Sequence, residues 1–325
     1  MTASASSMSV PLISFLVCTY HREDLIGPCL RSIAAQEGAD QGDCEIVVVD
    51  NSDDSTSAEA VRKVAAELTI PVKYIAAHPA NISVARNAGV LATQARYIAM
   101  IDDDMTVQVD WLRHARAAMG ALPYDVFSGP VIPVYERPEL ANAQTRAFFH
   151  RQMQVSEATP LQIMGKGRTP GYIPATSNSI FLRESCFSPD NLFDEHYGKS
   201  GGEDLDLFCR LENQGRRIAW LPDIVTQELV PARRCDASYL EKRSFVGGQV
   251  YASAHILNSP HPSFTRLKLT LIAWAQLTIL TLRSLVRGRS SGGPAHAQRM
   301  REAAVRGKLA WRHLVPFYQI EKKSS

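Results

Sequence analysis

The 325-residue sequence lacks a long apolar segment and several short catalytic motifs. Its most apolar run, Leu269–Leu282, is 14 residues long and contains Gln276, whereas a helix that spans a bilayer needs about 20 residues. No GxGxxG follows the first predicted strand, and neither GxxxxGK[ST] nor HExxH occurs. These absences argue against a spanning helix, a dinucleotide-binding fold, a P-loop nucleotidase and a zinc protease.

Paired cysteines and a signal peptide are also lacking. The six cysteines show no CxxC spacing, and the nine histidines do not pair with cysteines or carboxylates as they do in zinc sites. The N-terminal residues 1–10, MTASASSMSV, contain no basic residue and no long apolar core, and we expect them to be flexible. The sequence therefore predicts reduced thiols and a cytoplasmic protein.

The composition is that of a well-cored protein, but the charge is uneven. Hydrophobic residues make up 45% of the chain and charged residues 21%. The net charge is +2. Residues 283–325 contain ten Lys or Arg and two Glu, a local net charge of +8. The rest of the chain contains 25 basic and 31 acidic residues, a net charge of −6. A basic end favours a polyanionic partner, a membrane or a nucleic acid, although many basic helices are only solvated.

Strand and helix patterns alternate through the first hundred residues. Short apolar runs predict strands over Leu12–Val17, Glu45–Val49, Val72–Ile75 and Arg96–Ile101. Amphipathic patterns predict helices over Asp24–Gln36, over Ala58–Leu68, and from an N-cap at Ser83 to about Ala92. The alternation predicts an α/β fold in which helices cover both faces of a parallel sheet.

The remaining elements are less regular. Pro130–Pro174 is rich in Pro and Gly and predicts a loop-bearing region that folds over a site. Strands are expected over Asn178–Arg183 and Ile218–Leu221, and helices over Glu203–Asn213 and Ala237–Leu257. The apolar run Leu269–Leu282 and the mixed basic and apolar stretch Ala295–Phe317 together predict a membrane-surface anchor, or else helices packed on the body or a partner.

Polar residues follow three of the predicted parallel strands. They occupy Thr19–Arg22, Asp50–Ser52 and Asp102–Asp104. Open parallel sheets bind ligands outside the carboxyl ends of their strands. We therefore expect these three groups to share one binding rim.

The three adjacent carboxylates Asp102, Asp103 and Asp104 favour a cation site. Neighbouring carboxylates repel each other, and a bound cation relieves the repulsion. Hard oxygen ligands suit Mg²⁺ or Mn²⁺, which commonly bridge protein carboxylates and phosphates. The alternative is a solvated acidic turn, which the apolar strand directly before it disfavours.

Glu203 and Asp204 follow two glycines at the start of a predicted helix. Acidic residues favour the first helical turn for electrostatic reasons alone. Beside the Asp triplet, however, a second carboxylate is expected to act as general base for a hydroxyl. Arg86 either reaches the same rim, where it could bind a diphosphate, or is a surface arginine on a helix.

An ordered series of segments resembles the family 2 glycosyltransferases of the GT-A fold. The segments read VCTYHRED, VVVDNS, NISVARNAG, IDDDM, GKSGGEDLDLFCR, VPARR and KRSFVGGQ. They extend over roughly Leu12–Gln249 and are most similar to the exopolysaccharide glucosyltransferases of bacterial succinoglycan assembly. The resemblance implies a Rossmann-like, mostly parallel sheet over residues 11–262, before the basic C-terminal helices of residues 263–325.

The resemblance also implies roles for individual residues. The nucleotide-sugar would contact Thr19, Tyr20, Arg22, Asp50, Arg86, Asp102 and Asp103. Asp204 would be the catalytic base, with Glu203 and Gly202 on the acceptor side and Asp104 as metal ligand. Many relatives carry a His shortly before VPxxR; here Gln227 or Glu228 replaces it, or the contact is absent.

The activity so implied is metal-dependent, inverting transfer of a hexose, glucose by resemblance. The donor would be a UDP-sugar and the acceptor a polyprenyl-diphosphate-linked oligosaccharide, joined through a β-linkage. Such an enzyme would lie on the anionic inner face of the cell membrane and bind no nucleic acid. One alternative is a sugar-1-phosphate nucleotidyltransferase, which would carry a glycine-rich basic loop after the first strand; Thr19–Asp24 does not match such a loop. The other is a non-catalytic nucleotide-sugar-binding subunit of a membrane assembly complex, and the presence of Asp204 argues against it.

Overall fold

A computed structural model describes residues 10–287 and 293–317 of the chain. The strands of the main sheet are β1 (Ile13–Thr19), β2 (Cys44–Asp50), β3 (Val72–Ala76), β4 (Tyr97–Met100), β6 (Val126–Ser128), β8 (Thr159–Leu161), β9 (Ser179–Leu182) and β10 (Ile218–Trp220). A second, smaller sheet contains β5 (Met105–Val107), β7 (Val131–Tyr135) and β11 (Thr226–Val230). The order is β3-β2-β1-β4-β9-β6-β10-β8 in the main sheet and β5-β11-β7 in the second.

The expected α/β fold with a mostly parallel sheet is confirmed. Strands β3, β2, β1 and β4 pair in parallel, as do β6 and β10. Only β9, between β4 and β6, and the edge strand β8 run antiparallel to their neighbours within the main sheet. The carboxyl ends of the six parallel strands therefore meet at one edge, where the sequence predicts a binding rim.

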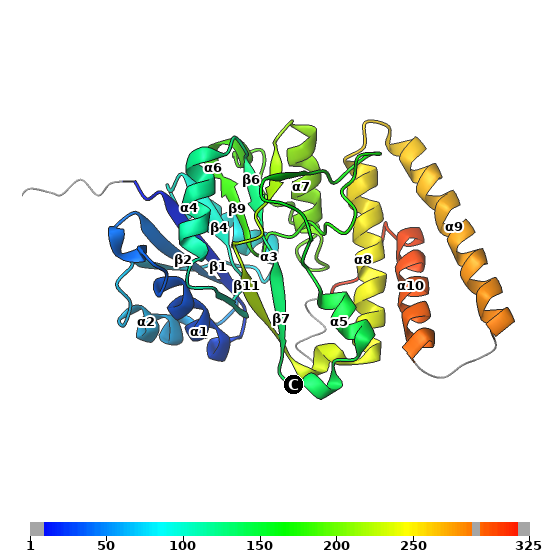
Figure 1. Ribbon diagram of the computed structural model, residues 1–325, viewed down its shortest axis with the longest axis horizontal. Coiled ribbons are helices and arrows are strands. Elements are labelled where there is room, and N and C mark those ends of the chain that lie inside the picture. The colour runs from blue at the N-terminus through cyan, green and yellow to red at the C-terminus, as the bar shows by residue number, and fades with distance from the viewer. Residues whose placement is uncertain (1–9, 288–292, 318–325) are drawn as a thin grey trace, which may run out of the picture.

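Helices cover both faces of the main sheet (Figure 1). One face packs against α1 (Glu23–Ala34), α2 (Ala58–Ala65) and α4 (Trp111–Ala121), and the other against α3 (Ile82–Ala92) and α7 (Glu203–Asn213). Alternate residues of one strand enter the two cores: Phe15 lies in the first and Leu16 in the second. Burial on both faces explains why the strands read as nearly continuous apolar runs.

The N-cap of α3 is Asn81, so the expectation of a Ser83 cap was wrong. The Asn81 side chain accepts hydrogen bonds from the backbone N–H of Ser83 at 2.9 Å and of Val84 at 3.3 Å. The Ser83 hydroxyl instead donates to the carbonyl of Asp194 at 2.9 Å. An Asn cap satisfies the first free N–H groups of a helix as well as Ser does.

The Pro- and Gly-rich region 130–174 is more regular than the sequence predicts. It contains β7, β8 and the helix α5 (Ala143–Phe149), as well as connecting loops. Strand β7 pairs with β11, and β11 also pairs with β5. This register sets Glu228 opposite Met105 and brings the backbone N–H of Leu229 to 2.9 Å from the carbonyl of Asp104. The second sheet thus carries β11 to the acidic triplet.

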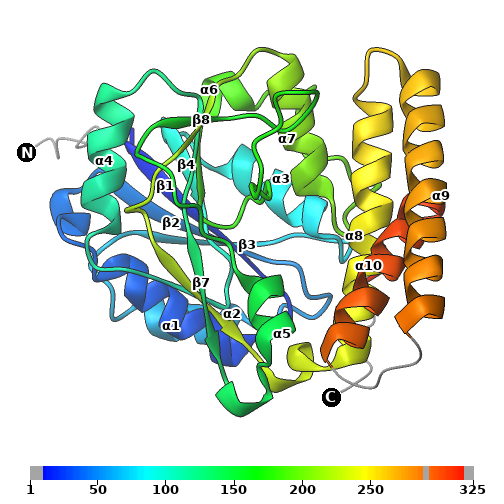
Figure 2. The same ribbon diagram turned by 45° about the vertical axis from the view of Figure 1, so that its right-hand side comes forward.

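The C-terminal part forms three long helices, α8 (Ala237–Leu257), α9 (Pro262–Arg287) and α10 (Gly293–Leu309). Figure 2 shows α9 at the outer edge of the molecule, with α8 and α10 between it and the sheet. A Cβ on Gly248 would lie 2.0 Å from the carbonyl oxygen of Ala304, and one on Gly307 would lie 2.0 Å from that of Phe245. Close glycine contacts therefore pack α10 against α8. For the stretch that begins at residue 295, the sequence left open a membrane-surface anchor or packing on the body, and α10 packs on the body.

Two expectations concern the ends of the chain and its membrane contact. Residues 1–9, expected to be flexible, and residues 288–292 and 318–325 of the predicted anchor lie outside the described residues. Within the described ranges, no helix combines the length and apolarity that crossing a bilayer requires.

Candidate active site

The three predicted polar groups do lie at the carboxyl ends of β1, β2 and β4. Thr19 and Asp50 are register partners at the ends of β1 and β2. The backbone N–H of Ile101 bonds the carbonyl of Leu16 at 3.1 Å, so Asp102 follows directly beyond the neighbouring strand. The rim thus joins segments about 30 to 50 residues apart in sequence, as parallel strands require.

Asp50 is fully buried and both of its carboxylate oxygens accept hydrogen bonds from the protein. Oδ1 accepts a hydrogen bond from the backbone N–H of Ser52 at 2.9 Å. Oδ2 accepts one from the backbone N–H of Ser57 at 3.0 Å and one from the hydroxyl of Tyr74 at 2.9 Å. The bonds tie the loop after β2 to the strand end. Asp50 therefore shapes the rim through the loop it holds.

Thr19 and Tyr20 form the start of the rim on the β1 side. Thr19 is 2% exposed, whereas Tyr20 is half-buried, with its ring edge against His21 at a centroid distance of 4.6 Å. Beyond them, Arg22 turns toward the acidic triplet: its Nη1 donates to Asp103 at 2.7 Å and to Asp104 at 3.2 Å.

A second arginine, Arg234, joins the triplet to β11. Its Nη1 lies 3.4 Å from Asp104 Oδ2 and 3.2 Å from Glu228 Oε1. Arg151 donates to the other oxygen of Glu228. The Glu228 side chain is buried while Gln227, the next residue along the strand, is exposed. Of the two candidates for an additional metal ligand, Glu228 therefore lies in the site and Gln227 points away from it.

Arg86 connects the triplet to the start of α7. Its guanidinium donates to Glu203 and, at 2.5 Å, to Asp204, and it lies 3.8 Å from Asp102. The Arg86 side chain is 8% exposed, so it is not the surface arginine of the alternative interpretation. A buried guanidinium with several carboxylate partners is a strong, charge-assisted contact.

Gly202 sets where α7 begins. It is the N-cap residue, with φ 107°, in the left-handed region that favours glycine. A Cβ there would lie 2.2 Å from Cγ1 of Val250 on α8. The close approach presents Glu203 and Asp204 in the first turn of the helix, where the helix dipole favours negative charge.

Glu203 and Asp204 have different environments although they are neighbours. Glu203 is 1% exposed, and burial, reinforced by the Asp204 charge and opposed by Arg86, raises its pKa to about 7. The Asp204 side chain is 22% exposed, and both of its bonds, from Arg86 and from the Thr176 hydroxyl at 2.9 Å, go to Oδ1. Asp204 thus offers its second oxygen to a ligand.

These contacts form two groups of charges, joined through the consecutive residues Asp102 and Asp103, which together we call the charge network. In the described part of the chain it contains the carboxylates Asp102, Asp103, Asp104, Glu203, Asp204 and Glu228 and the guanidinium groups of Arg22, Arg86, Arg151 and Arg234. Six negative and four positive groups leave a formal balance of −2. Two buried oxygens, Asp103 Oδ2 and Glu203 Oε2, have no hydrogen-bond partner there. The excess of negative charge lies on the carboxylates that share Arg86, and it fits a divalent cation at the rim.

The donor set fits a metal that is shared with a ligand. Among the described residues, no three His, Cys, Asp or Glu side chains converge as a complete cation cage. Mg²⁺ typically binds through one or two carboxylates and completes its coordination with water and substrate phosphates. Asp104, with Asp102 beside it, supplies such hard oxygen donors at the rim.

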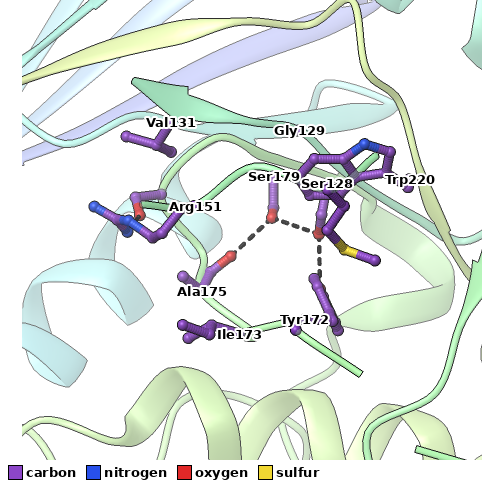
Figure 3. A pocket seen from close by; sticks show the side chains of 12 residues that line it. Ser128, Gly129, Val131, Arg151, Tyr172, Ile173, Ala175, Ser179 and Trp220 are labelled. Atoms are coloured by element: carbon purple, nitrogen blue, oxygen red, sulfur yellow. Dashed lines mark hydrogen bonds between the residues drawn. The ribbon is translucent and has the colours of Figure 1, made fainter. Parts of the chain in front are cut away.

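A hollow adjoins this network on the β6 side (Figure 3). Arg151 and Ser177 line it, and so do Ser128, Tyr172 and Ser179, whose hydroxyl groups are linked at 2.9 Å. Its volume of about 20 Å³ is room for a single water molecule. A wider hollow of about 310 Å³ shares Met153 and Trp220 with it and is also lined by Gln152 and Gln154. The nitrogen Nε1 of Trp220 is buried without a partner in the described structure.

Three residues of the site were not assigned a role from the sequence. Arg234 lies in the VPARR segment that carries part of the resemblance, so its position could have been found. Arg151 follows α5 and forms an isolated β-bridge with Val131, and Thr176 precedes β9; no periodicity or motif singles out either residue. Only the folded chain brings them to Glu228 and Asp204.

Comparisons with known proteins agree with this architecture. Residues 14–186, more than half of the chain, match the family model "Glycosyl transferase family 2". The succinoglycan biosynthesis protein ExoM of Rhizobium meliloti is 31% identical over 242 residues, 72% of this chain and 72% of its own length. A second relative, ExoO of the same organism, is 33% identical over 143 residues, 41% of this chain and 39% of its own.

Solved structures share the fold at low sequence identity. The mannosyltransferase PcManGT of Pyrobaculum calidifontis, in complex with GDP-Man and Mn²⁺, is 18% identical with a TM-score of 0.58, and the match covers 93% of this chain and 86% of that one. TarS 1–349 of S. aureus, in complex with UDP, is 17% identical with a TM-score of 0.54, covering 92% and 91%. These structures share the fold, and the family match together with the ExoM likeness shows that the chain belongs to glycosyl transferase family 2.

Proposed function

We propose that the chain transfers a hexose from a UDP-sugar to a hydroxyl group of a lipid-linked oligosaccharide, with inversion to a β-linkage. The observation that carries the proposal is the position of Asp204: one carboxylate oxygen is held by Arg86 and Thr176 and the other is left for a ligand. Arg86 also lies 3.8 Å from Asp102. A general base and an acidic triplet are thus parts of the same site.

The donor half of the site is formed by the strand ends. The nucleoside would lie against Thr19 and Tyr20, beside the loop that Asp50 holds, with Asp102 and Asp103 toward the ribose. Arg22 and Arg86 already pair with these carboxylates and can turn part of their hydrogen-bonding capacity to a diphosphate. UDP is inferred from the resemblance and from UDP in the similar TarS structure. Glucose is inferred from the exopolysaccharide relatives alone.

The site has the groups for a single displacement. Asp204 Oδ2 accepts the proton of the acceptor hydroxyl as its oxygen forms a bond to the anomeric carbon. The bond from that carbon to the diphosphate oxygen breaks on the opposite face, and the electron pair leaves with the nucleoside diphosphate. One displacement inverts the anomeric centre without a covalent enzyme intermediate. The oxocarbenium character of such a transition state is stabilised by nearby carboxylates.

Mg²⁺ or Mn²⁺ would be held by Asp104, with Asp102 or Glu228 as further oxygen donors. When bound, the ion neutralises charge on the departing diphosphate. The four guanidinium groups already offset part of the carboxylate charge, and in the bound state they would also attract the diphosphate. PcManGT, which was solved with Mn²⁺, supports a divalent ion in this fold.

The acceptor would approach over the hollows beside Asp204. Ala175 and Ser177, on either side of Thr176, line the smaller hollow, which leads to the wider one at Trp220. The wider hollow is also lined by Gln152 and Gln154, whose amide groups can bind sugar hydroxyls. The lipid-linked class of acceptor is inferred from the succinoglycan relatives.

Replacing Asp204 by Asn tests the role of the base. Asn keeps the shape but accepts no proton, so we expect transfer to fall by 10²-fold or more. UDP-sugar binding, measured by calorimetry, should stay within a few-fold of the parent. The matched control is Asp190→Asn at an exposed position, which should keep full activity. Transfer at the parent rate in the Asp204 variant would refute the assignment of the base, whereas no transfer by the parent chain would favour the non-catalytic alternative.

A further inference from the structure

Helix α9 carries a continuous apolar surface that nothing in the described chain covers. Its members, all 40–67% exposed, are Phe264, Leu267, Leu271, Ile272, Trp274, Ile279 and Leu282. Seven of the fifteen exposed large hydrophobic residues of the described chain thus lie on one helix. Exposed apolar residues are ordinary when scattered, but a continuous group marks a contact surface. We call this group the α9 stripe.

The stripe follows from the orientation of the helix. Phe264, Leu267, Leu271 and Trp274 recur at three- and four-residue spacing and so share one face. The opposite face packs on the body: Ala273 is fully buried. Gln276 and the carbonyl of Leu280, also on the packed side, bond with α10, at 3.3 Å with Lys308 and at 3.1 Å with Gln298. The stripe is therefore held outward by the packing of the other side.

The charges of α9 are all of one sign. The helix contains no Asp or Glu, whereas Lys268 lies within the exposed face and Arg266 and Arg283 are also exposed. A second copy would bring like charges together along the seam, where helix pairs normally place opposite charges. An anionic lipid surface attracts each basic residue near it. The charge pattern therefore favours lipid over a second copy.

We propose that the α9 stripe docks on an anionic lipid leaflet, with the helix lying in the plane of the interface. The 26-residue helix is about 39 Å long, at 1.5 Å per residue. It has the combination typical of interfacial helices: Trp, Phe and Leu on one face, with Lys and Arg within and beside that face. The sequence led us to expect that Leu269–Leu282 and Ala295–Phe317 form a membrane-surface anchor together. The proposal assigns the membrane contact to α9 alone, because α10 packs on α8 through Gly248 and Gly307. It does not depend on the proposed transfer reaction.

Vesicle binding by the full chain tests the proposal. Sedimentation with vesicles of phosphatidylcholine and about one third phosphatidylglycerol should retain the protein, and vesicles of phosphatidylcholine alone should retain far less. Binding should weaken at about 1 M NaCl, where the Debye length is only ~3 Å. Equal binding to both vesicle types, or none to either, would overturn the proposal.

Substitutions on the stripe locate the contact. The double variant Leu271→Gln and Trp274→Gln should weaken vesicle binding about ten-fold or more, because two large apolar side chains no longer enter the interface. Lys268→Gln and Arg283→Gln should each weaken it about five-fold. The matched control is Leu91→Gln with Val109→Gln, 61% and 59% exposed on other elements. An equal loss in the control variant would show that the stripe is not the contact.

The fluorescence of Trp274 gives a local readout. It is 59% exposed, whereas Trp111 and Trp220 are buried and Trp311 is partly buried. Brominated lipids should therefore quench Trp274 most strongly, and Trp274→Phe should remove most of the quenching. Light scattering of the parent and of the Leu271 and Trp274 double variant tests the alternative that the stripe binds a second copy of the chain. A dimer that this variant dissociates, with no quenching by lipid, would replace the leaflet by a second copy and refute the proposal.

Discussion

Replacing Arg86 by Met tests the charge network directly. Arg86 pairs with Glu203, Asp204 and Asp102, and its side chain is only 8% exposed. Met is a flexible apolar side chain that fills part of the same space. The change therefore removes a buried positive charge with less loss of packing than Ala would cause. It leaves Glu203, 1% exposed, beside Asp204 without its guanidinium.

The magnitude follows from the burial of Glu203. Its pKa is raised from 4.5 to about 7 even with Arg86 present. A raised pKa means that the folded state binds the proton more tightly, so this carboxyl costs no stability below pH 4.5. The cost grows as the pH rises and reaches about 3 kcal/mol above pH 7. Without Arg86 the pKa rises further, and the cost continues to grow above pH 7.

The expected loss of unfolding free energy in Arg86→Met is about 3–5 kcal/mol at pH 8, as for other broken buried ion pairs. At pH 5 the loss should be clearly smaller, because Glu203 is then mostly protonated in the folded parent as well. Urea unfolding at both pH values measures the difference. Adding Glu203→Gln to Arg86→Met should restore part of the stability at pH 8, since it removes the uncompensated charge.

The exposed ion pair of Arg113 and Asp110 gives a matched control. The Arg113 side chain is 57% exposed and pairs at 3.2 Å, and such surface pairs contribute about 0–1 kcal/mol. Arg113→Met should therefore leave the unfolding curve nearly unchanged at both pH values. An Arg86→Met loss that is as small as this, or that is the same at pH 5 and pH 8, would refute the charge argument.

Two further predictions concern packing and the metal. Gly248→Ala should destabilise the fold by about 1–3 kcal/mol because its Cβ would lie 2.0 Å from the carbonyl oxygen of Ala304. Gly247→Ala should not destabilise it, because a Cβ there would have nothing within 4 Å. Equal melting curves of the two variants would contradict the close packing of α8 and α10. Asp104→Ala should abolish the part of UDP affinity that EDTA removes, measured by calorimetry. Glu228→Ala should weaken that part and Gln227→Ala should not, and the reverse order would exchange their assignments.

The sequence determined the fold class and most of its elements. Continuous apolar runs such as Glu45–Val49 predict strands buried on both faces, because only a sheet covered on both sides favours them. The helices over Glu203–Asn213 and Ala237–Leu257 were predicted to the residue, since a glycine-bounded start and an Asp cap are local features. The order of motifs determined the family as well.

Tertiary structure decided which residues meet. The antiparallel entry of β9 and the pairing of β11 with β5 and β7 depend on long-range register, which no local pattern specifies. That register selects Glu228 over Gln227 as the side chain near Asp104, because successive residues of a strand point to opposite faces. In the same way the packing of α10 on α8, and of one side of α9 on α10, decided which of two similar amphipathic stretches faces outward. Composition gives both stretches apolar and basic residues, but only packing determines which surface stays uncovered.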